Sequence, residues 1–338
     1  MNIKSLLIGS AAALAAVSGA QAADAIVAAE PEPMEYVRVC DAFGTGFFYI
    51  PGTETCLKFG GYIRFQTDFG RDKSGTSDWD SFTRAQFEVD TRTDTELGAL
   101  RGFIGFRGNA DNGSSSSSSV FVDQAFIELG GLKVGKFYNW WDDGLSGEAD
   151  ELSSNALFNS IRYTYDAGSF YVGVSADELE GITVGPFNES DNNVGISAAI
   201  GAKLGAASLQ FIGGYDVDRE NGALRLIATA DVGPGTFGIS GVWASGANAY
   251  YSVSEWAVAA EYAIKATDKL TITPGAQYYG SYGLVSWDDF SDNDAWKAGL
   301  TVDYKITSGL SAKVAVNYFD IDNGDDQVTG FVRLQRSF

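Results

Sequence analysis

The sequence of 338 residues contains no histidine. This absence excludes serine and cysteine catalysis that relies on an imidazole base, and it excludes zinc sites that use histidine ligands. The stretch GGLKVGKF resembles a phosphate-binding loop only superficially, because its spacing is wrong and no Ser or Thr follows the second lysine. Proton transfer by carboxylates stays open. We nevertheless expect no enzyme, no cofactor and no metal site.

Basic residues and cysteines are also scarce. There are 23 Lys and Arg against 44 Asp and Glu, a formal net charge of -21, which argues against nucleic-acid binding because that requires a basic surface. Cys40 and Cys56 are the only cysteines. In an exported chain they most simply form one disulfide, whose loop of about 15 residues contributes roughly 3 kcal/mol. A redox pair is the alternative, although no Cys-x-x-Cys motif is present.

Long hydrophobic runs are nearly absent. The run LLIGSAAALAAVSGA follows Lys4 and precedes Ala20-Gln21-Ala22, a pattern typical of a cleaved signal peptide. No later stretch approaches about 18 consecutive apolar residues, the length that suggests a membrane helix. We therefore expect a signal peptide at residues 1–22 and an N-terminal segment with the disulfide at residues 23–56. Without Lys4 the chain keeps 22 basic and 44 acidic residues, a formal charge of -22.

Apolar and polar residues alternate from residue 57 to residue 338. Near the C-terminus, Leu310, Val314 and Tyr318 share one parity, whereas Lys313 and Asn317 have the other. This period of two predicts strands with one apolar and one polar face. Leu310 to Tyr318 spans about 30 Å of strand, or roughly 23 Å vertically at a tilt of 40°, close to the apolar band of a transmembrane barrel.

Sixteen alternating segments can be placed, joined by short and long connections in strict alternation. They centre on 57–69, 81–93, 98–109, 120–130, 132–138, 158–166, 169–177, 192–203, 207–216, 223–232, 236–245, 251–266, 270–280, 294–306, 310–319 and 327–338. The fold class predicted is all-β, a 16-stranded antiparallel transmembrane barrel over residues 57–338, closed because an open sheet edge in lipid leaves backbone groups unsatisfied. A soluble β-sandwich is the alternative, but it needs neither aromatic strand ends nor alternating loop lengths.

Three motifs resemble the alphaproteobacterial porin family of the Brucella and Rhizobium type. They are YVRVCDAFGTGFFYIPGTETCL at residues 36–57, the leader MNIKSLLIGSAAAL and the C-terminal VRLQRSF, in which Arg336 departs from the usual apolar pattern. The resemblance implies a homotrimer in the outer membrane, in contact with its lipid and lipopolysaccharide. It also implies a water-filled pore that passes small hydrophilic solutes and ions, with the third extracellular loop folded inward.

The third long connection, NWWDDGLSGEADELSSNA, would supply the acidic side of a pore constriction. Its carboxylates are Asp142, Asp143, Glu148, Asp150 and Glu151. The opposing basic wall would consist of Arg64, Arg84, Arg101 and Arg162, which parity assigns to the lumen together with Arg92, Arg107, Arg225 and Arg333. Opposed charges create a transverse field that disfavours apolar solutes. The alternatives are a solvated acidic loop, and arginines that merely pair with Glu88, Asp90 or Glu128.

Several functional alternatives stay open. The leading hypothesis is a general diffusion channel; the others are a channel specific for sugars or anions and a non-conducting surface barrel. Tyr138, Trp140 and Trp141 would suit an aromatic slide for sugars. The charge of the chain predicts a mild cation preference unless the lumen arginines reverse it. The acidic stretch DIDNGDD at residues 320–326, with Asp320, Asp322 and Asp325, has calcium-like spacing but lacks the downstream Glu, and we interpret it as an external loop.

Overall fold

The computed structural model describes residues 37–111 and 119–338. The predicted signal peptide, the first part of the segment 23–56 and most of the serine run at residues 114–119 lie outside the described residues. The chain divides into residues 1–38 and residues 39–338, and the fold given below is that of the second unit. Within the described ranges, no helix has the length and apolar character needed to cross a membrane.

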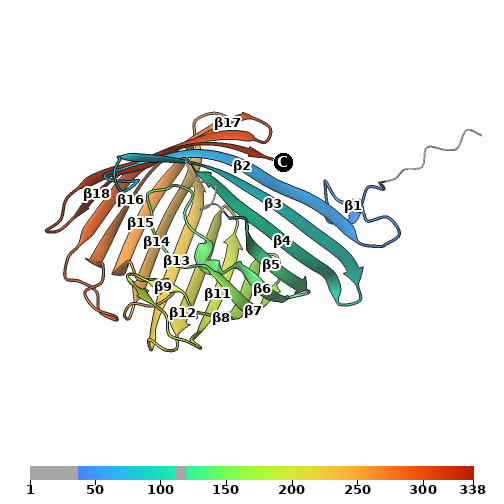
Figure 1. Cartoon of the computed structure of the whole chain (residues 1–338), viewed down its shortest axis with the longest axis horizontal. Helices are drawn as coiled ribbons and strands as arrows, with labels where there is room; N and C mark the ends of the chain where they lie inside the picture. The colour runs from blue at the N-terminus through green and yellow to red at the C-terminus, as the bar shows by residue number, and fades with distance from the viewer. Residues whose placement is uncertain (1–36, 112–118) are drawn as a thin grey trace, which may run out of the picture. The chain divides into compact units, whose positions relative to one another are not determined.

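In the described part of the chain, sixteen long strands form one closed antiparallel sheet (Figure 1). They are β2 Cys56–Phe69, β3 Trp79–Thr95, β4 Gly98–Asp111, β5 Phe121–Leu129, β6 Leu132–Tyr138, β7 Leu157–Asp166, β8 Phe170–Glu178, β11 Val194–Leu204, β12 Ala207–Asp216, β13 Asn221–Val232, β14 Gly235–Ala244, β15 Ser254–Lys265, β16 Leu270–Tyr282, β17 Ala295–Thr307, β18 Leu310–Ile321 and β19 Gln327–Ser337. Each pairs with its neighbours along the chain, and β19 pairs back onto β2. The predicted sixteen-stranded barrel is confirmed.

The connections alternate in length as the sequence predicts, except that the β12–β13 connection, residues 217–220, is no longer than the turn 266–269 at the other end. Two-residue turns such as 130–131 join strands at one end of the barrel, and Gly130 has a φ of 57°, which suits glycine in a tight hairpin turn. Long connections lie at the other end and include residues 139–156 between β6 and β7 and residues 245–253 between β14 and β15. The connection between β8 and β11 contains a small hairpin of β9 Thr183–Val184 and β10 Phe187–Asn188.

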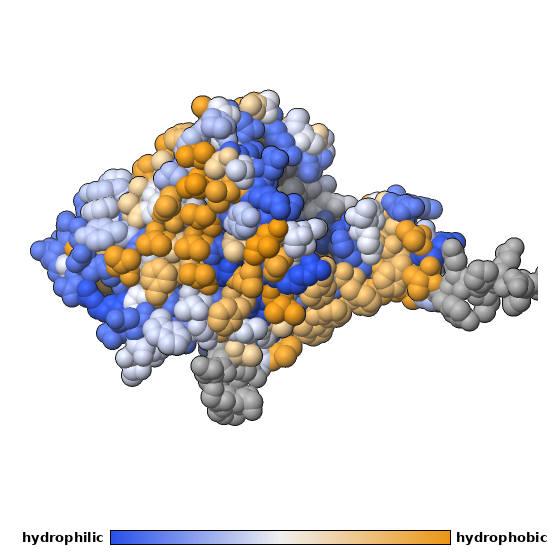
Figure 2. Space-filling model, turned by 90° about the horizontal axis from the view of Figure 1, so that it is seen from above, coloured by the Kyte–Doolittle hydropathy of each residue, from blue (hydrophilic) through white to orange (hydrophobic). Residues whose placement is uncertain are grey.

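The two faces of the barrel wall differ in polarity. On β8, Val174 is 52% exposed on the outer face, whereas the neighbouring Ser175 on the inner face is 1% exposed. Figure 2 shows hydrophobic residues gathered in a band across the face in view, with hydrophilic residues beyond it on the left. An apolar outside over a polar inside is the arrangement of a barrel that lies in lipid.

The segment before the barrel is attached by the disulfide. Cys40 and Cys56 are bonded, with 6.0 Å between their Cα atoms, which confirms the predicted pairing. Phe47 is buried beside this bond, and its ring lies 5.7 Å from Lys58 Nζ and 5.1 Å from the Arg92 guanidinium. The short β1, Phe48–Tyr49, pairs with the start of β2. Residues 39–55 therefore lie at the short-turn end of β2 and β3.

Candidate functional site

The β6–β7 loop, residues 139–156, lies against the inner face of strands β15 to β17. The carboxylate of Glu261 on β15 accepts hydrogen bonds from the backbone N–H groups of Ser146 and Gly147, both at 2.7 Å. A Cβ on Gly147 would stand 2.6 Å from Glu261 Oε2, so any larger residue would have to displace this carboxylate. The N–H of Glu148 donates to Thr301 Oγ1 on β17 at 2.9 Å. Inner-face polar side chains thus satisfy the backbone of the loop.

Arg225 on β13 joins the two ends of the β6–β7 loop. Its guanidinium donates to the carbonyl oxygens of Trp140 at 2.9 Å, Trp141 at 3.0 Å and Leu152 at 3.2 Å. The residue is 1% exposed, and no carboxylate of the described residues forms an ion pair with it. A charge buried in this way is tolerated only when hydrogen bonds replace its water. Arg225 therefore fixes the loop from inside the barrel wall.

Three of the five predicted acidic residues have exposed side chains, and the other two are partly buried. The exposed ones are Asp142, Asp143 and Glu151. Asp143 accepts a hydrogen bond from Gln210 Nε2 on β12 at 2.6 Å. The Asp142 carboxylate is within electrostatic range of Arg225 and Arg107. These residues keep the negative charge of the loop accessible to solvent.

The partly buried pair is Glu148 and Asp150. Glu148 forms an ion pair with Lys313 on β18 at 2.9 Å, so Lys313 faces the interior as its parity predicts but contacts the loop. Burial, and then the charge of Glu261, raise the pKa of Asp150 to about 6. One loop carboxylate is therefore neutralised by a lysine, and the other takes up a proton close to neutral pH.

An arginine cluster lies on four adjacent strands, β19, β2, β3 and β4. Arg64 and Arg84 face each other directly in register, and Arg64 is also within electrostatic range of Arg107 and Arg333. All four side chains are partly exposed on the inner face. Arg107 is paired with Asp123 at 2.8 Å, but among the described residues no carboxylate lies within ion-pair distance of the other three.

The uncompensated arginines bind neutral side chains instead. Arg64 Nε donates to Gln335 at 2.8 Å, and Arg84 Nε donates to Asn109 at 2.9 Å. Arg333 is within electrostatic range of Glu148, which belongs to the β6–β7 loop. The cluster therefore presents positive charge to the lumen on the side that faces the loop acids.

The other two arginines of the predicted wall lie apart from this cluster. Arg101 pairs with Asp90 at 2.9 Å and with Glu128 at 3.5 Å, close to the short-turn end of the barrel, which is the pairing that one alternative foresaw. Arg162 packs over the rings of Phe137 and Trp140, with centroid distances of 4.6 and 4.7 Å. Sequence parity placed Arg107 and Arg333 in the lumen but gave no reason to choose them over these two.

The aromatic-slide alternative does not fit the positions of two of its three rings. The indole of Trp141 is fully buried against Tyr250, and Trp140 is also buried, so neither ring lines an open passage as an aromatic slide would. In the acidic stretch near the C-terminus, Asp325 pairs with Arg71 at 2.8 Å. Across residues 37–111 and 119–338, no three acidic or cysteine side chains are grouped as metal ligands.

Burial divides the inner wall into two sectors. Toward the long-loop end, inner-face side chains of β7 to β14 are almost completely buried, for example Ser175, Ser197, Ile212 and Val242, whereas Arg162 and Gln210 are partly exposed. The inner-face arginines of β19 to β4 are partly exposed. At the long-loop end, solvent therefore reaches the interior mainly along the arginine cluster.

Comparisons with known proteins agree with this architecture. A family model described as "Porin subfamily" matches residues 24–334. The outer membrane protein IIIA of Rhizobium leguminosarum bv. viciae is 52% identical over 98% of this chain and 93% of its own length, and porin Omp2b of Brucella suis biovar 1 is 35% identical over 100% of both. The trimer form of OmpT, an outer membrane protein of Vibrio cholerae, has a TM-score of 0.65 at 17% identity, covering 85% of this chain and 100% of that chain.

Proposed function

The chain belongs to the porin subfamily, and we propose that its pore narrows between the β6–β7 loop and the arginine cluster of β19 to β4. It is an outer-membrane porin, a transmembrane β-barrel that forms a channel. Family membership points to a channel rather than an enzyme. The solutes proposed are small, hydrophilic and carried by passive diffusion.

The opposed charges on the inner wall carry this proposal. Arg64, Arg84 and Arg333 have no carboxylate partner among the described residues, while Asp142 and Glu148 lie within electrostatic range of Arg107 and Arg333. Opposed rows of charge across a narrow aqueous passage orient dipolar solutes and disfavour apolar ones. Arg101 and Arg162 would line the wall nearer the short-turn end.

Reversal potentials across a KCl gradient in planar bilayers test the constriction. Amide replacement of all five loop acids, Asp142, Asp143, Glu148, Asp150 and Glu151, should shift selectivity toward anions, because the negative side of the field is lost. Asp72→Asn, in the exposed β2–β3 connection, is the control and should leave the potential unchanged. An unchanged potential in the loop variant would remove the loop from the pore.

We also propose a homotrimer that contacts outer-membrane lipid and lipopolysaccharide. The proposal rests on family membership and on the trimer form in which the related fold of OmpT was solved. Single-channel recordings of the refolded protein should then close in three equal steps. One closing step for each insertion would contradict the trimer while leaving the channel intact.

A further inference from the structure

The β14–β15 loop, residues 245–253, is buried although it connects two strands at the long-loop end. Ala247, Asn248, Ala249, Tyr250 and Tyr251 are all 0% exposed. The β2–β3 connection at the same end is exposed throughout residues 71–78. The sequence SGANAYYSV carries no charge, which makes its burial inexpensive. The β14–β15 loop is therefore packed inside the protein, unlike the solvent-exposed β2–β3 connection.

Tyr250 shows where the loop lies. Its ring packs against Phe158 on β7, with 5.6 Å between centroids. A Cβ built on Gly195 of β11 would stand 2.2 Å from the Tyr250 hydroxyl oxygen, and one on Gly214 of β12 would stand 2.5 Å from the ring. Both glycines belong to the inner face. The inner wall of β11 and β12 is thus hollowed to receive this side chain, as close packing requires.

A buried carboxylate holds this loop and the β6–β7 loop together. Asp177 on β8 is 1% exposed and accepts hydrogen bonds from the Tyr250 hydroxyl at 2.7 Å and from Asn139 Nδ2 at 2.9 Å. Ser160, Ser175 and Ser197 donate to it as well, at 2.6, 2.6 and 2.8 Å. Five donors compensate the buried charge without a cation. Asn139 starts the β6–β7 loop, so one carboxylate anchors both loops.

Direct contacts also join the two loops. The backbone N–H of Ser154 donates to the Tyr250 carbonyl at 2.9 Å, and Asn155 Nδ2 donates to the Ala249 carbonyl at 2.9 Å. The hydroxyls of Ser154 and Ser252 are 3.0 Å apart. The end of the β6–β7 loop therefore rests on the β14–β15 loop.

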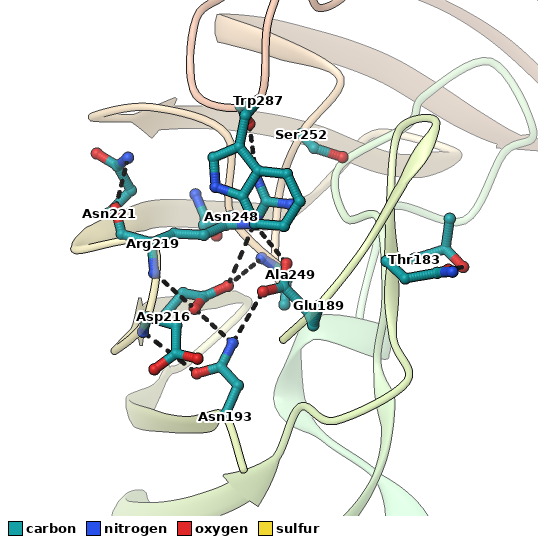
Figure 3. Close-up of polar contacts among 12 residues, drawn as sticks. Thr183, Glu189, Asn193, Asp216, Arg219, Asn221, Asn248, Ala249, Ser252 and Trp287 are labelled. Atoms are coloured by element: carbon teal, nitrogen blue, oxygen red, sulfur yellow. Dashed lines mark hydrogen bonds and ion pairs between the residues drawn. The ribbon is translucent and has the colours of Figure 1, made fainter. Parts of the chain in front are cut away.

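Residues of three other connections, β8–β11, β12–β13 and β16–β17, form a polar network beside the β14–β15 loop (Figure 3). Asp216 accepts from the Ala249 N–H at 3.0 Å and from Asn193 Nδ2 at 2.8 Å. Arg219, fully buried, pairs with Glu189 and lies 3.8 Å from the centroid of the Trp287 ring. Segments from three connections thus meet beside the loop, and Asp216 links them to it through the Ala249 N–H.

We propose that the β14–β15 loop is a second inward-folded segment, which fills the lumen at the long-loop ends of β7, β8, β11 and β12 and there confines solutes to the side lined by the arginine cluster. It sets the size limit of the channel together with the β6–β7 loop, which rests on it. The inference depends on the proposed function for the passage itself, but the position of the loop stands on its own contacts.

Replacement of residues 246–252 by two glycines tests the role in permeation. Removal of a segment that fills one sector should raise single-channel conductance about twofold or more and admit larger neutral sugars in liposome swelling, because conductance follows the open cross-section. The same replacement of residues 72–77 is the control and should change neither quantity. Unchanged conductance and size limit would overturn the inference, whereas a wild-type protein that does not conduct would overturn the proposed function instead.

A disulfide cross-link tests the contact without removing any part of the loop. Ser154→Cys combined with Ser252→Cys should form a bond under mild oxidation in the folded trimer, because the parent hydroxyls are already in contact. Conductance should stay at the wild-type value, since the bond joins loops that are already together. If both thiols instead remain open to a small maleimide under oxidising conditions, the loop is elsewhere and the inference fails. Each single-cysteine variant controls for labelling.

Discussion

Replacement of Arg225 by methionine should loosen the β6–β7 loop without removing any charge that faces the passage. Within residues 37–111 and 119–338, the guanidinium is the one group that bonds to Trp140, Trp141 and Leu152 together, and it is buried. Methionine fills a similar volume and has no donor. The change therefore isolates the three hydrogen bonds from the packing.

The magnitude follows from two opposing contributions. Three hydrogen bonds from a charged donor contribute roughly 1.5–3 kcal/mol each. Their loss is partly offset because a buried charge, which costs several kcal/mol to desolvate, disappears as well. A net loss of about 3 kcal/mol remains, which corresponds to roughly a hundredfold increase in the fraction of time that the loop is detached.

Single-channel recording is the assay, since brief loop excursions change the current through an open channel. We expect excess open-channel noise and short transitions to higher conductance in Arg225→Met, and an intermediate result in Arg225→Lys, which keeps the charge but cannot reach three carbonyls. Arg71→Met, in the exposed β2–β3 connection, is the matched control. Wild-type noise and thermal stability in Arg225→Met would refute the reasoning.

Other perturbations have equally definite outcomes. Arg84→Gln should shift the reversal potential toward cation selectivity, more than Arg101→Gln, whose charge is already offset by carboxylates; equal shifts would contradict the assignment of the wall. Because the pKa of Asp150 is raised to about 6, the loop gains a proton as pH falls from about 7 to about 5, so cation selectivity should decline in the wild type and stay constant in Asp150→Asn. The folded state binds this proton more tightly than the unfolded chain, with its ordinary pKa of 3.8, so stability should rise as pH falls through that window. Replacement of Cys40 and Cys56 by serine should lower the free energy of unfolding by about 3 kcal/mol in denaturant titrations, with unchanged conductance.

The fold was predictable because the same alternation of apolar and polar residues repeats in every strand. Every strand must present apolar residues to lipid and polar residues to water, so alternation marks each of the sixteen, and none of the predicted ends differs from the observed strand ends by more than three residues. Short turns need glycine or its equivalents, and these punctuate one end of the barrel. The alternation and the turn residues are both local patterns, so both can be recognised in one sequence without an alignment.

The candidate site was predictable only in part, because parity assigns a face but not a partner. It placed Arg64 and Arg101 on the inner wall alike, yet only Arg101 has carboxylates beside it. The anchoring roles of Arg225 and Glu261 depend on how the β6–β7 loop crosses the lumen, and loop paths carry no periodic signal. The uncharged SGANAYYSV was the single available hint that a second loop is buried.

The pairing of β19 with β2 has a consequence for how this protein is made. Arg64 on β2 bonds to Gln335 on β19, a partner 271 positions later in the chain. A contact of such separation cannot nucleate assembly, and sheets dominated by distant pairings form slowly. The barrel therefore closes only after the C-terminal hairpin has formed. Until then the edges of the sheet keep unpaired backbone N–H and C=O groups, through which neighbouring copies can aggregate.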